Sequence, residues 1–421
     1  MRFKIVSLGC PKNLVESEYI TERLCSAGHT LGDDGDTVII NTCAFIAEAA
    51  RESIETILGV AKDGDRRIVV TGCLVERYRE KLPDLLPEVG AFVGRACYGD
   101  IDRIIGENGF HHREGVFSET FPRRVLTKPP TTYLKIQEGC DNRCHYCTIP
   151  SIRGGLTSRT EDDILQEFRW LLGQGYLEIN IIAQDITSYG KDRGSKDGLA
   201  GLIRKLLREK GDYYLRLLYM HPKGVTERLV DLMGSDGRII PYLDIPVQHC
   251  EDRILSLMGR GHTKACLEEL IAMAAGRLPE AVLRTSIIVG FPTETDEEFE
   301  ALLAFVQRHR FDALGAFMYA REEGTAAYKL KGQVKMGIKR ARYNRLMETQ
   351  KEISRQRLTR FMGKTVRVVV EDDAANPKVG RMLTQAPDID GVAFVTGQCR
   401  AGDVREGKVV KTLDYDVVVE V

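Results

Sequence analysis

The chain has 421 residues, and its 60 lysines plus arginines nearly balance 61 aspartates plus glutamates, giving a formal net charge of −1. This balance excludes a general electrostatic attraction to nucleic acid, and no run of 18 apolar residues could span a membrane. The length predicts two or three domains. Because the apolar start is too short for a signal sequence, we expect a cytoplasmic protein whose 11 cysteines favour metal ligation over disulfides.

The first domain is predicted to cover residues 1–117, where apolar runs alternate with helical patterns. The expected strands cover residues 3–8, 37–41, 66–71 and 91–94. Helices are expected between them at residues 14–27, 44–62 and 74–82. Such a β-α-β-α order predicts a parallel α/β sheet.

Each of the first three strands runs into a cysteine: Cys10, Cys43 and Cys73. Parallel strands present their carboxyl ends at one edge of the sheet, so we expect these thiols to converge there. Helices begin at the same edge, and their N-terminal amides favour thiolates. The pattern favours an iron–sulfur cluster with one open iron; the alternative is that cysteine is simply a common buried residue at strand ends. The same alternative is our interpretation of the remaining cysteines, Cys25, Cys97, Cys250, Cys266 and Cys399.

Residues 118–130, rich in Pro, Arg and Thr, are predicted to be a linker to a second domain at residues 131–333. The domain has six predicted strands separated by amphipathic helices, at residues 133–137, 178–183, 214–219, 242–245, 283–289 and 314–318. Six βα units are too few for a closed eight-fold barrel and predict an open, partial (β/α)6 barrel.

Directly after the first of these strands stands a C-x3-C-x2-C run formed by Cys140, Cys144 and Cys147. Three thiolates can hold three irons of a [4Fe-4S] cluster and leave the fourth iron open to a small molecule. The alternative is a zinc site with His145 as the fourth ligand, but zinc sites usually consist of paired C-x2-C units.

Further polar or glycine-containing loops follow other strands of this array. Arg153, Ser158 and Arg159 lie in a glycine-containing loop that is suited to a carboxylate. Gln184 and Asp185 follow the second strand, and His249 follows the fourth. Gly290 follows the fifth strand, where bare backbone can approach an adenine or ribose. A plain turn explains any one of these signals taken alone, and His249 alone is more often structural than catalytic.

The chain ends with a connecting helix at residues 334–362 and a β-rich domain at residues 363–421. The helix carries many Lys and Arg residues, which favour a solvated surface over a phosphate-binding face. Five short strands then predict a small antiparallel β-barrel, at residues 365–370, 381–384, 393–396, 408–412 and 417–421. Its excess of acidic residues favours a basic protein partner over nucleic acid.

The whole chain resembles the radical S-adenosylmethionine (SAM) methylthiotransferases, which have an N-terminal domain with three separated cysteines, a radical SAM partial barrel and a C-terminal TRAM barrel. Four segments are similar to the branch that acts on ribosomal protein uS12, namely residues 8–18 (LGCPKNLVESE), 149–154 (IPSIRG), 245–249 (IPVQH) and 386–391 (APDIDG). Cys250 beside His249 departs from the usual pattern of the family.

The resemblance implies two [4Fe-4S] clusters, one held by Cys140, Cys144 and Cys147 and an auxiliary one held by Cys10, Cys43 and Cys73. It further implies that SAM is cleaved to a 5′-deoxyadenosyl radical, that an aspartate β-carbon of uS12 loses a hydrogen, and that the auxiliary cluster supplies a methylated sulfur. The implied SAM contacts are Arg153, Ser158, Arg159, Gln184, Asp185 and Gly290. The implied partners are uS12 and a low-potential electron donor of the flavodoxin or ferredoxin type, with no membrane.

Two other functions stay open on sequence grounds. One is a tRNA adenosine methylthiotransferase, which the basic helix would suit and which predicts salt-sensitive binding of tRNA. The other is an electron carrier or cluster scaffold without catalytic activity, which predicts that the reduced protein leaves SAM intact. The electron donor, the oligomeric state, the order of methyl and sulfur transfer and the fate of the auxiliary cluster do not follow from the sequence.

Overall fold

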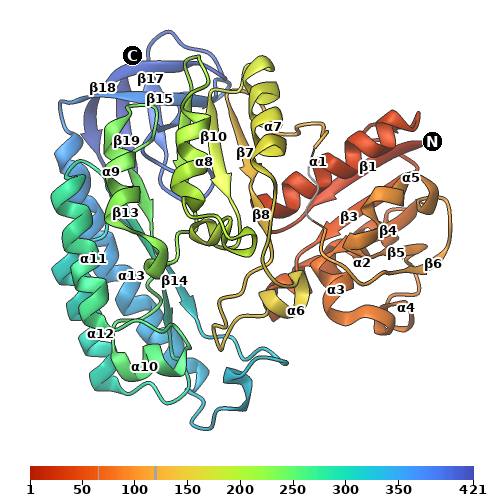
Figure 1. The fold of residues 1–421 in the computed structure, drawn as a ribbon, viewed down its shortest axis with the longest axis horizontal. Coiled ribbons are helices and arrows are strands. Elements are labelled where there is room, and N and C mark those ends of the chain that lie inside the picture. Colours follow the sequence, from red (N-terminus) through yellow and green to blue (C-terminus); the bar gives the residue numbers. More distant parts are fainter. Residues whose placement is uncertain (65, 118–120) are drawn as a thin grey trace.

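The computed structural model describes residues 1–64, 66–117 and 121–421, so the first three residues of the predicted linker lie outside the described residues. An N-terminal α/β unit, a central α/β unit and a C-terminal β unit follow one another along the chain (Figure 1). The α/β fold class and this order of units are confirmed.

The N-terminal unit contains one six-stranded sheet in which every pairing is parallel. Its strand order is β2-β1-β3-β4-β5-β6. The strands are β1 (Arg2–Ser7), β2 (Thr30–Leu31), β3 (Thr37–Thr42), β4 (Arg67–Gly72), β5 (Ala91–Val93) and β6 (Gly109–His111). The helices are α1 (Pro11–Ser26), α2 (Ala47–Lys62), α3 (Cys73–Tyr78), α4 (Leu82–Leu85) and α5 (Ile101–Ile104). Strands β3 and β4 are buried on both faces, which explains their nearly continuous apolar runs.

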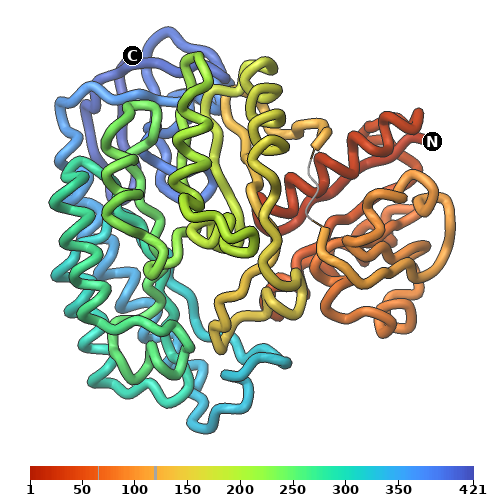
Figure 2. The backbone as a smooth tube through the Cα atoms, viewed as in Figure 1, coloured from red at the N-terminus to blue at the C-terminus, as the bar shows by residue number. Residues whose placement is uncertain are grey.

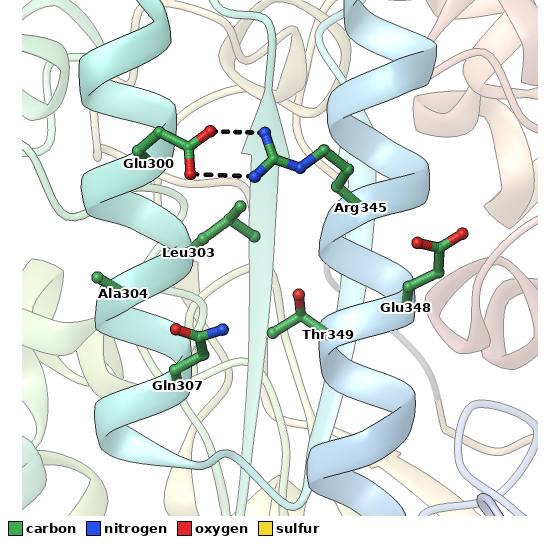
Figure 3. Close-up of a pocket in the computed structure, with 7 residues that line it drawn as sticks. All are labelled: Glu300, Leu303, Ala304, Gln307, Arg345, Glu348 and Thr349. Atoms are coloured by element: carbon green, nitrogen blue, oxygen red, sulfur yellow. Dashed lines mark hydrogen bonds and ion pairs between the residues drawn. The ribbon is translucent and has the colours of Figure 1, made fainter.

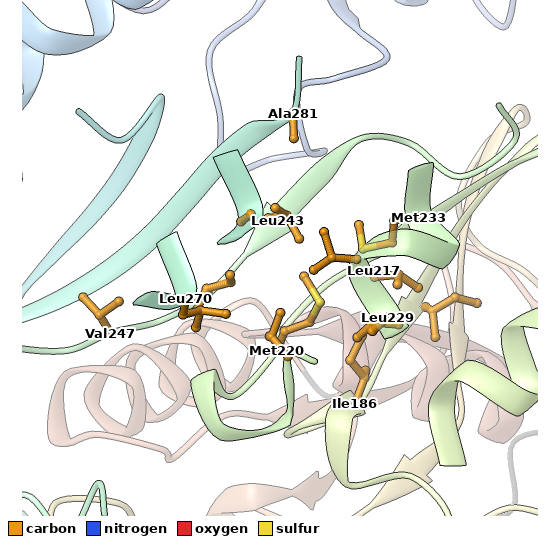
Figure 4. Close-up of a cluster of buried hydrophobic side chains, with 14 of the residues drawn as sticks. Ile186, Leu217, Met220, Leu229, Met233, Leu243, Val247, Leu270 and Ala281 are labelled. Atoms are coloured by element: carbon orange, nitrogen blue, oxygen red, sulfur yellow. The ribbon is translucent and has the colours of Figure 1, made fainter. Parts of the chain in front are cut away.

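The central unit is a partial barrel of six parallel strands. They are β7 (Thr131–Lys135), β10 (Glu178–Ile182), β11 (Tyr214–Leu217), β12 (Tyr242–Asp244), β13 (Val282–Val289) and β14 (Ala313–Met318). Two three-stranded sheets, β11-β10-β7 and β12-β13-β14, meet where Leu215 bridges Ile239. Strands β7 and β14 are not paired with each other, so the barrel stays open as predicted. Figure 4 shows part of the core behind the strands, where Leu217 and Leu243 pack with Met220, Leu229 and Leu270.

Helices surround this barrel on its outer side. They are α7 (Glu161–Gly173), α8 (Gly198–Leu206), α9 (Glu227–Ser235), α11 (Lys264–Arg277), α12 (Asp296–His309) and α13 (Met336–Leu358). Helix α6 (Ile149–Arg153) instead lies against α3 of the N-terminal unit, and α10 (Asp252–Leu257) lies at the carboxyl end of the barrel (Figure 1). A small antiparallel pair, β8 (Gln137–Glu138) with β9 (Thr157–Ser158), brackets the cysteine loop and α6. Helix α12 begins with a capping box in which Thr295 and Glu298 satisfy each other's backbone amides, so its start is fixed locally.

The C-terminal unit is a closed five-stranded barrel with strand order β15-β16-β17-β19-β18. The strands are β15 (Thr365–Asp372), β16 (Lys378–Met382), β17 (Ala393–Thr396), β18 (Val404–Thr412) and β19 (Val417–Glu420). The small barrel is confirmed, with one difference from the expected antiparallel pattern: β17 and β19 pair in parallel. The long strand β18 lies between them in the chain and crosses back beside β15 and β19, which leaves β19 running in the same direction as β17.

This barrel closes the amino end of the central strands, the end opposite the cysteine loop (Figure 2). Arg381 of β16 forms ion pairs with Glu178, the first residue of β10, and Arg216 of β11 donates 2.8 Å to the same carboxylate. Tyr133 donates a hydrogen bond to Asp388, which is exposed, and Tyr242 donates one to Asp390, which is half-buried. Part of the acidic excess of this domain is therefore used inside the molecule and is not offered to a partner.

The N-terminal and central units are joined through α1, whose sides are nearly all buried. Leu14 and Val15 pack against Tyr133 and Ile182 of the central strands. The described part of the predicted linker is anchored as well. Arg123 is 1% exposed and forms ion pairs with Glu18 of α1 and Glu167 of α7. Among the described residues, no helix is both long enough and apolar enough to cross a membrane.

We predict that Glu178→Gln lowers the free energy of unfolding more than Glu371→Gln does, because it weakens the contact between the C-terminal barrel and the central unit. Both carboxylates pair with Arg381, but Glu178 is fully buried and also faces Arg216, whereas Glu371 is 43% exposed. Breaking a buried pair leaves two uncompensated guanidinium groups, at a cost of about 3–5 kcal/mol, against about 0–1 kcal/mol at the surface. Urea unfolding followed by far-UV circular dichroism would measure both, and equal midpoints for the two variants would contradict the prediction.

Candidate functional site

The structure brings Cys10, Cys43 and Cys73 to one edge of the N-terminal sheet, because they follow the carboxyl ends of the neighbouring strands β1, β3 and β4. Burial and then the nearby thiols of Cys73 and Cys10 raise the pKa of Cys43 to about 11. Although burial alone would raise it, Lys12 and Arg153 hold the pKa of Cys10 below its usual value. The geometry agrees, because Sγ of Cys73 lies 3.9 Å from Oδ1 of Asn13 in the first turn of α1, the helix for which Cys10 is the N-cap.

Glycines with positive φ precede three of the predicted ligands, and they explain how the thiols approach one another. Gly9 has φ +84°, and a Cβ there would lie 2.6 Å from Cβ and 2.8 Å from Sγ of Cys43. Gly72 (φ +89°) and Gly139 (φ +69°) likewise leave no room for a side chain against neighbouring backbone. Only glycine combines this conformation with this proximity.

Cys140, Cys144 and Cys147 lie in the loop after β8, at the carboxyl end of the central barrel. The loop is held by backbone bonds from Cys140 N to Gly154 O (3.2 Å) and from Cys147 N to Cys144 O (3.1 Å). Burial raises the pKa of Cys147 to about 12, with the Cys144 and Cys140 thiols adding to the effect. The three thiols therefore lie in one hydrogen-bonded loop.

His145 does not point to a zinc site. Its Nδ1 lies 2.9 Å from the carbonyl oxygen of Leu257, which can only accept, so this nitrogen carries the proton. The other side of the ring packs on Gly259. Within the described ranges, no three His, Cys, Asp or Glu side chains are close enough to share one metal ion. Two sets of three separate thiolates instead suit cubane clusters, in which each thiolate binds a different iron.

Five charged side chains, completely buried, connect the two cysteine sites. Glu16 of α1 accepts from Arg95, Lys135 and Arg153 at 2.8, 3.0 and 2.8 Å. Glu138 of β8 accepts from the same three cations at 2.7–3.1 Å. Although burial opposes it, the cations hold the pKa values of both carboxyls low, that of Glu138 at about 2. Both carboxylates are therefore ionised at neutral pH.

This network ends on both cysteine sites. Arg153 Nη2 lies 3.3 Å from Sγ of Cys73, and it also donates to Asn13. Glu138 Oε1 accepts from the amide of Gly139, which directly precedes Cys140, at 3.1 Å. Burial raises the pKa of Cys73 above its usual value, and Arg153 and Arg95 of this network, whose three cations and two carboxylates give a net charge of +1, oppose that rise.

Of the predicted SAM contacts, Gln184 has an open polar atom. Its Nε2 donates to Glu138 at 2.6 Å, while its buried Oε1 has no partner among the described residues. Asp185 beside it is saturated, because its oxygens accept from Asn142 (2.6 Å), Ser188 (2.7 Å) and Thr187 (2.6 Å). A buried acceptor without a donor suits a ligand ammonium group.

The other predicted contacts are placed as follows. Gly290 ends β13 with φ +71°, and its amide donates to Glu294 at 2.8 Å. Ser158 is engaged with Asp192 at 2.6 Å. Arg159 pairs with Asp163 and Glu167 on the outer side of the barrel. Arg153 lies at Cys73, closer to the N-terminal cysteine site than its loop position suggested.

His249 and Cys250 are both buried beside the core. Burial lowers the pKa of His249 to about 3, so the ring is neutral. Cys250 packs in the apolar cluster of the central unit, which supports the interpretation as a small buried hydrophobe. Cys266 is exposed, so that interpretation was wrong for it, because it lies at the solvent side of the first turn of α11.

Sequence reasoning missed Glu16, Arg95, Lys135 and Glu138 as parts of the site. A signal was present, because Lys135 stands inside the largely apolar strand predicted at residues 133–137 and Glu138 directly follows it. A charge in a buried strand needs a partner of opposite charge, so such positions point to a network.

The cleft between α12 and α13 does not belong to this site. Figure 3 shows it lined by polar side chains, with Arg345 bound to Glu300 through two bonds of 2.5 and 3.0 Å. It lies on the outer surface of the barrel, away from the strand ends that carry the cysteines.

Comparison with known proteins agrees with this geometry. Models of the Radical SAM superfamily, of an uncharacterized protein family (UPF0004) and of the TRAM domain match residues 134–306, 2–94 and 362–421. The ribosomal protein uS12 methylthiotransferase RimO of Geobacter sulfurreducens is 42% identical over 100% of this chain and 98% of its own length. RimO of Thermotoga maritima is 42% identical over 99% of both chains.

The chain belongs to the RimO family of radical SAM methylthiotransferases. The predicted family is thereby confirmed. Solved structures agree in fold: the radical SAM methyltransferase TsrM of Kitasatospora setae has a TM-score of 0.58 at 16% identity, covering 77% of this chain and 76% of its own. The cobalamin-dependent SAM radical enzyme OxsB has a TM-score of 0.54 at 14% identity, covering 84% and 56%.

We predict that Gly9→Ala prevents the N-terminal cysteines of this RimO-family protein from holding a cluster. The added methyl group would overlap Cys43, and the positive φ disfavours any side chain. After anaerobic reconstitution, iron should fall from about eight to about four atoms per chain, as expected on losing one of two cubanes. Gly59→Ala is the matched control, because a Cβ there meets nothing within 4 Å and the residue lies in α2. Full iron in Gly9→Ala would contradict the prediction.

Proposed function

We propose that this protein methylthiolates the β-carbon of an aspartate in ribosomal protein uS12, using two [4Fe-4S] clusters and SAM. The observation that carries the proposal is similarity to RimO proteins over essentially the whole of both chains. Two sets of three thiols joined by one buried network support it. The proposed domains are residues 1–117 for the auxiliary cluster, 131–333 for SAM and 363–421 for the TRAM barrel, with a linker at 118–130 and a connecting helix at 334–362.

The two groups of cysteines are the proposed cluster ligands: Cys140, Cys144 and Cys147 in the central unit and Cys10, Cys43 and Cys73 in the N-terminal unit. When bound, the clusters and SAM supply the radical chemistry and the sulfur that no side chain can supply. The protein contributes thiolates and a network of net positive charge next to Cys73.

For SAM, we propose direct contacts at Gln184 and Gly290. The free Oε1 of Gln184 would accept from the ammonium group. Gly290 would lie against the nucleoside without using its amide, which donates to Glu294, or the side of its Cα that Lys339 covers. Asp185, Ser158 and Arg159 would act by positioning, because their polar atoms already have protein partners. Arg153 would join this set through the network and through Cys73.

Charge supports a protein substrate over tRNA. The cations of α13 are largely neutralised within the molecule: Arg342 pairs with Glu294, and Arg345 with Glu300. Arg357 and Arg360 both pair with Asp312. Little unpaired positive charge is left on this helix for a phosphate backbone.

We also propose a cytoplasmic location, where thiols stay reduced, and a flavodoxin- or ferredoxin-type electron donor.

The decisive assay incubates reconstituted protein with SAM, reductant and either a uS12 peptide containing the aspartate or tRNA. We predict that only the peptide gains a methylthio group by mass spectrometry. Cys10→Ala should still form 5′-deoxyadenosine but lose sulfur transfer, whereas Cys144→Ala should lose both. Cys266→Ala, at an exposed cysteine outside both groups, should keep both activities. A gain on tRNA alone would reject the substrate, and intact SAM with wild-type protein would reject the enzyme.

A further inference from the structure

Four basic side chains gather beside the cysteine loop without an acidic partner of their own. His221 and Lys223 follow β11, while Arg260 and His262 lie between α10 and α11. The His221 and His262 rings are 5.8 Å apart and nearly perpendicular, and the Lys223 ammonium lies over the backbone of Gly261. Within the described ranges, none of the four belongs to an ion pair.

Several of these groups are buried with polar atoms unused. Arg260 is 4% exposed, and it donates to Pro246 O at 2.6 Å and lies 3.5 Å from Sγ of Cys144, yet its Nε has no partner in the described chain. Both ring nitrogens of His262 are also buried without a partner there. Burying such groups unsatisfied costs free energy, so their arrangement indicates a missing ligand.

The nearest carboxylate does not fill this role. Asp185 accepts from the amide of His221 at 3.3 Å, but both of its oxygens are occupied by Asn142, Thr187 and Ser188. Within the described residues, it forms no hydrogen bond or ion pair with the side chains of Lys223 and Arg260. The ligand that satisfies them must therefore bring negative charge and acceptor oxygens.

We propose that His221, Lys223, Arg260 and His262 form a carboxylate-binding subsite next to Cys144. The inference rests on the proposed function, which brings two carboxylates to this end of the barrel: that of the substrate aspartate and the methionyl carboxylate of SAM. Each of these carboxylates has two acceptor oxygens and could accept from the same four side chains. Lys223 is exposed and reaches the cluster from the open side, while Arg260 holds the inner side against the cysteine loop.

The test uses reconstituted holoenzyme of Lys223→Gln and of the double variant Lys223→Gln/His262→Gln. Equilibrium dialysis measures the Kd of SAM, and fluorescence anisotropy measures the Kd of labelled uS12 peptides with Asp or Asn at the target position. We expect one of these affinities to fall about tenfold or more, the size of a lost hydrogen bond to a charged group. Lys264→Gln is the matched control, because this nearby lysine already pairs with Glu251 at 3.1 Å.

The results distinguish the carboxylate of SAM from that of the substrate aspartate. A weaker Kd for SAM assigns the subsite to the methionyl carboxylate, and a weaker Kd for the Asp peptide but not the Asn peptide assigns it to the substrate. Unchanged affinities for both, in variants with wild-type iron content, overturn the subsite. If wild-type protein binds no peptide, the proposed substrate fails instead, and the SAM measurement still decides the subsite. Lys223 is exposed, so its single variant tests the inference even if the double variant does not fold.

Discussion

The architecture depends on the buried group of Glu16, Glu138, Arg95, Lys135 and Arg153. Each charge lost its hydration on folding, and only the complete set of partners offsets that cost. Because Glu16 and Arg95 come from the N-terminal unit and the other three from the central unit, the network is satisfied in one relative orientation of the two. That orientation places the two cysteine groups at opposite ends of a single chain of contacts, through Arg153 to Cys73 and through Glu138 to Gly139.

The C-terminal barrel and the cysteine loop lie at opposite ends of the central barrel. Glu178, Arg216 and Arg381 close the amino end of the strands with the C-terminal barrel. The carboxyl end carries the cysteine loop, and α1 reaches the same strands from the side with Leu14 and Val15. A substrate must therefore approach from the carboxyl end, on the side where Lys223 is exposed, and the TRAM barrel stands away from the proposed chemistry. A contribution of that barrel to substrate binding would have to come from its outer surface, since Asp390 is already bonded to Tyr242 within the molecule.

Local patterns in the sequence predicted the strands and the convergence of Cys10, Cys43 and Cys73, because strand ends and helix starts follow from neighbouring residues. They did not predict that Arg153 would meet Glu16, 137 positions away, since such contacts depend on how whole units dock. The parallel pairing of β17 with β19 was not predicted either, because it depends on the course of β18 between them and not on the residues of either strand. The role of Arg260 beside Cys144 was hidden too, because nothing in its immediate sequence distinguishes a solvated arginine from a buried one.

The central claim is that two groups of three cysteines each hold a cluster with one iron free, and that the network joins them. An anaerobic crystal structure of the reconstituted protein with SAM tests it most directly. The account predicts one cubane on Cys140, Cys144 and Cys147 and another on Cys10, Cys43 and Cys73, with both open irons facing one enclosed space and SAM between Gln184 and Gly290. A fourth protein ligand on either cluster, or open irons that face separate spaces, would contradict it.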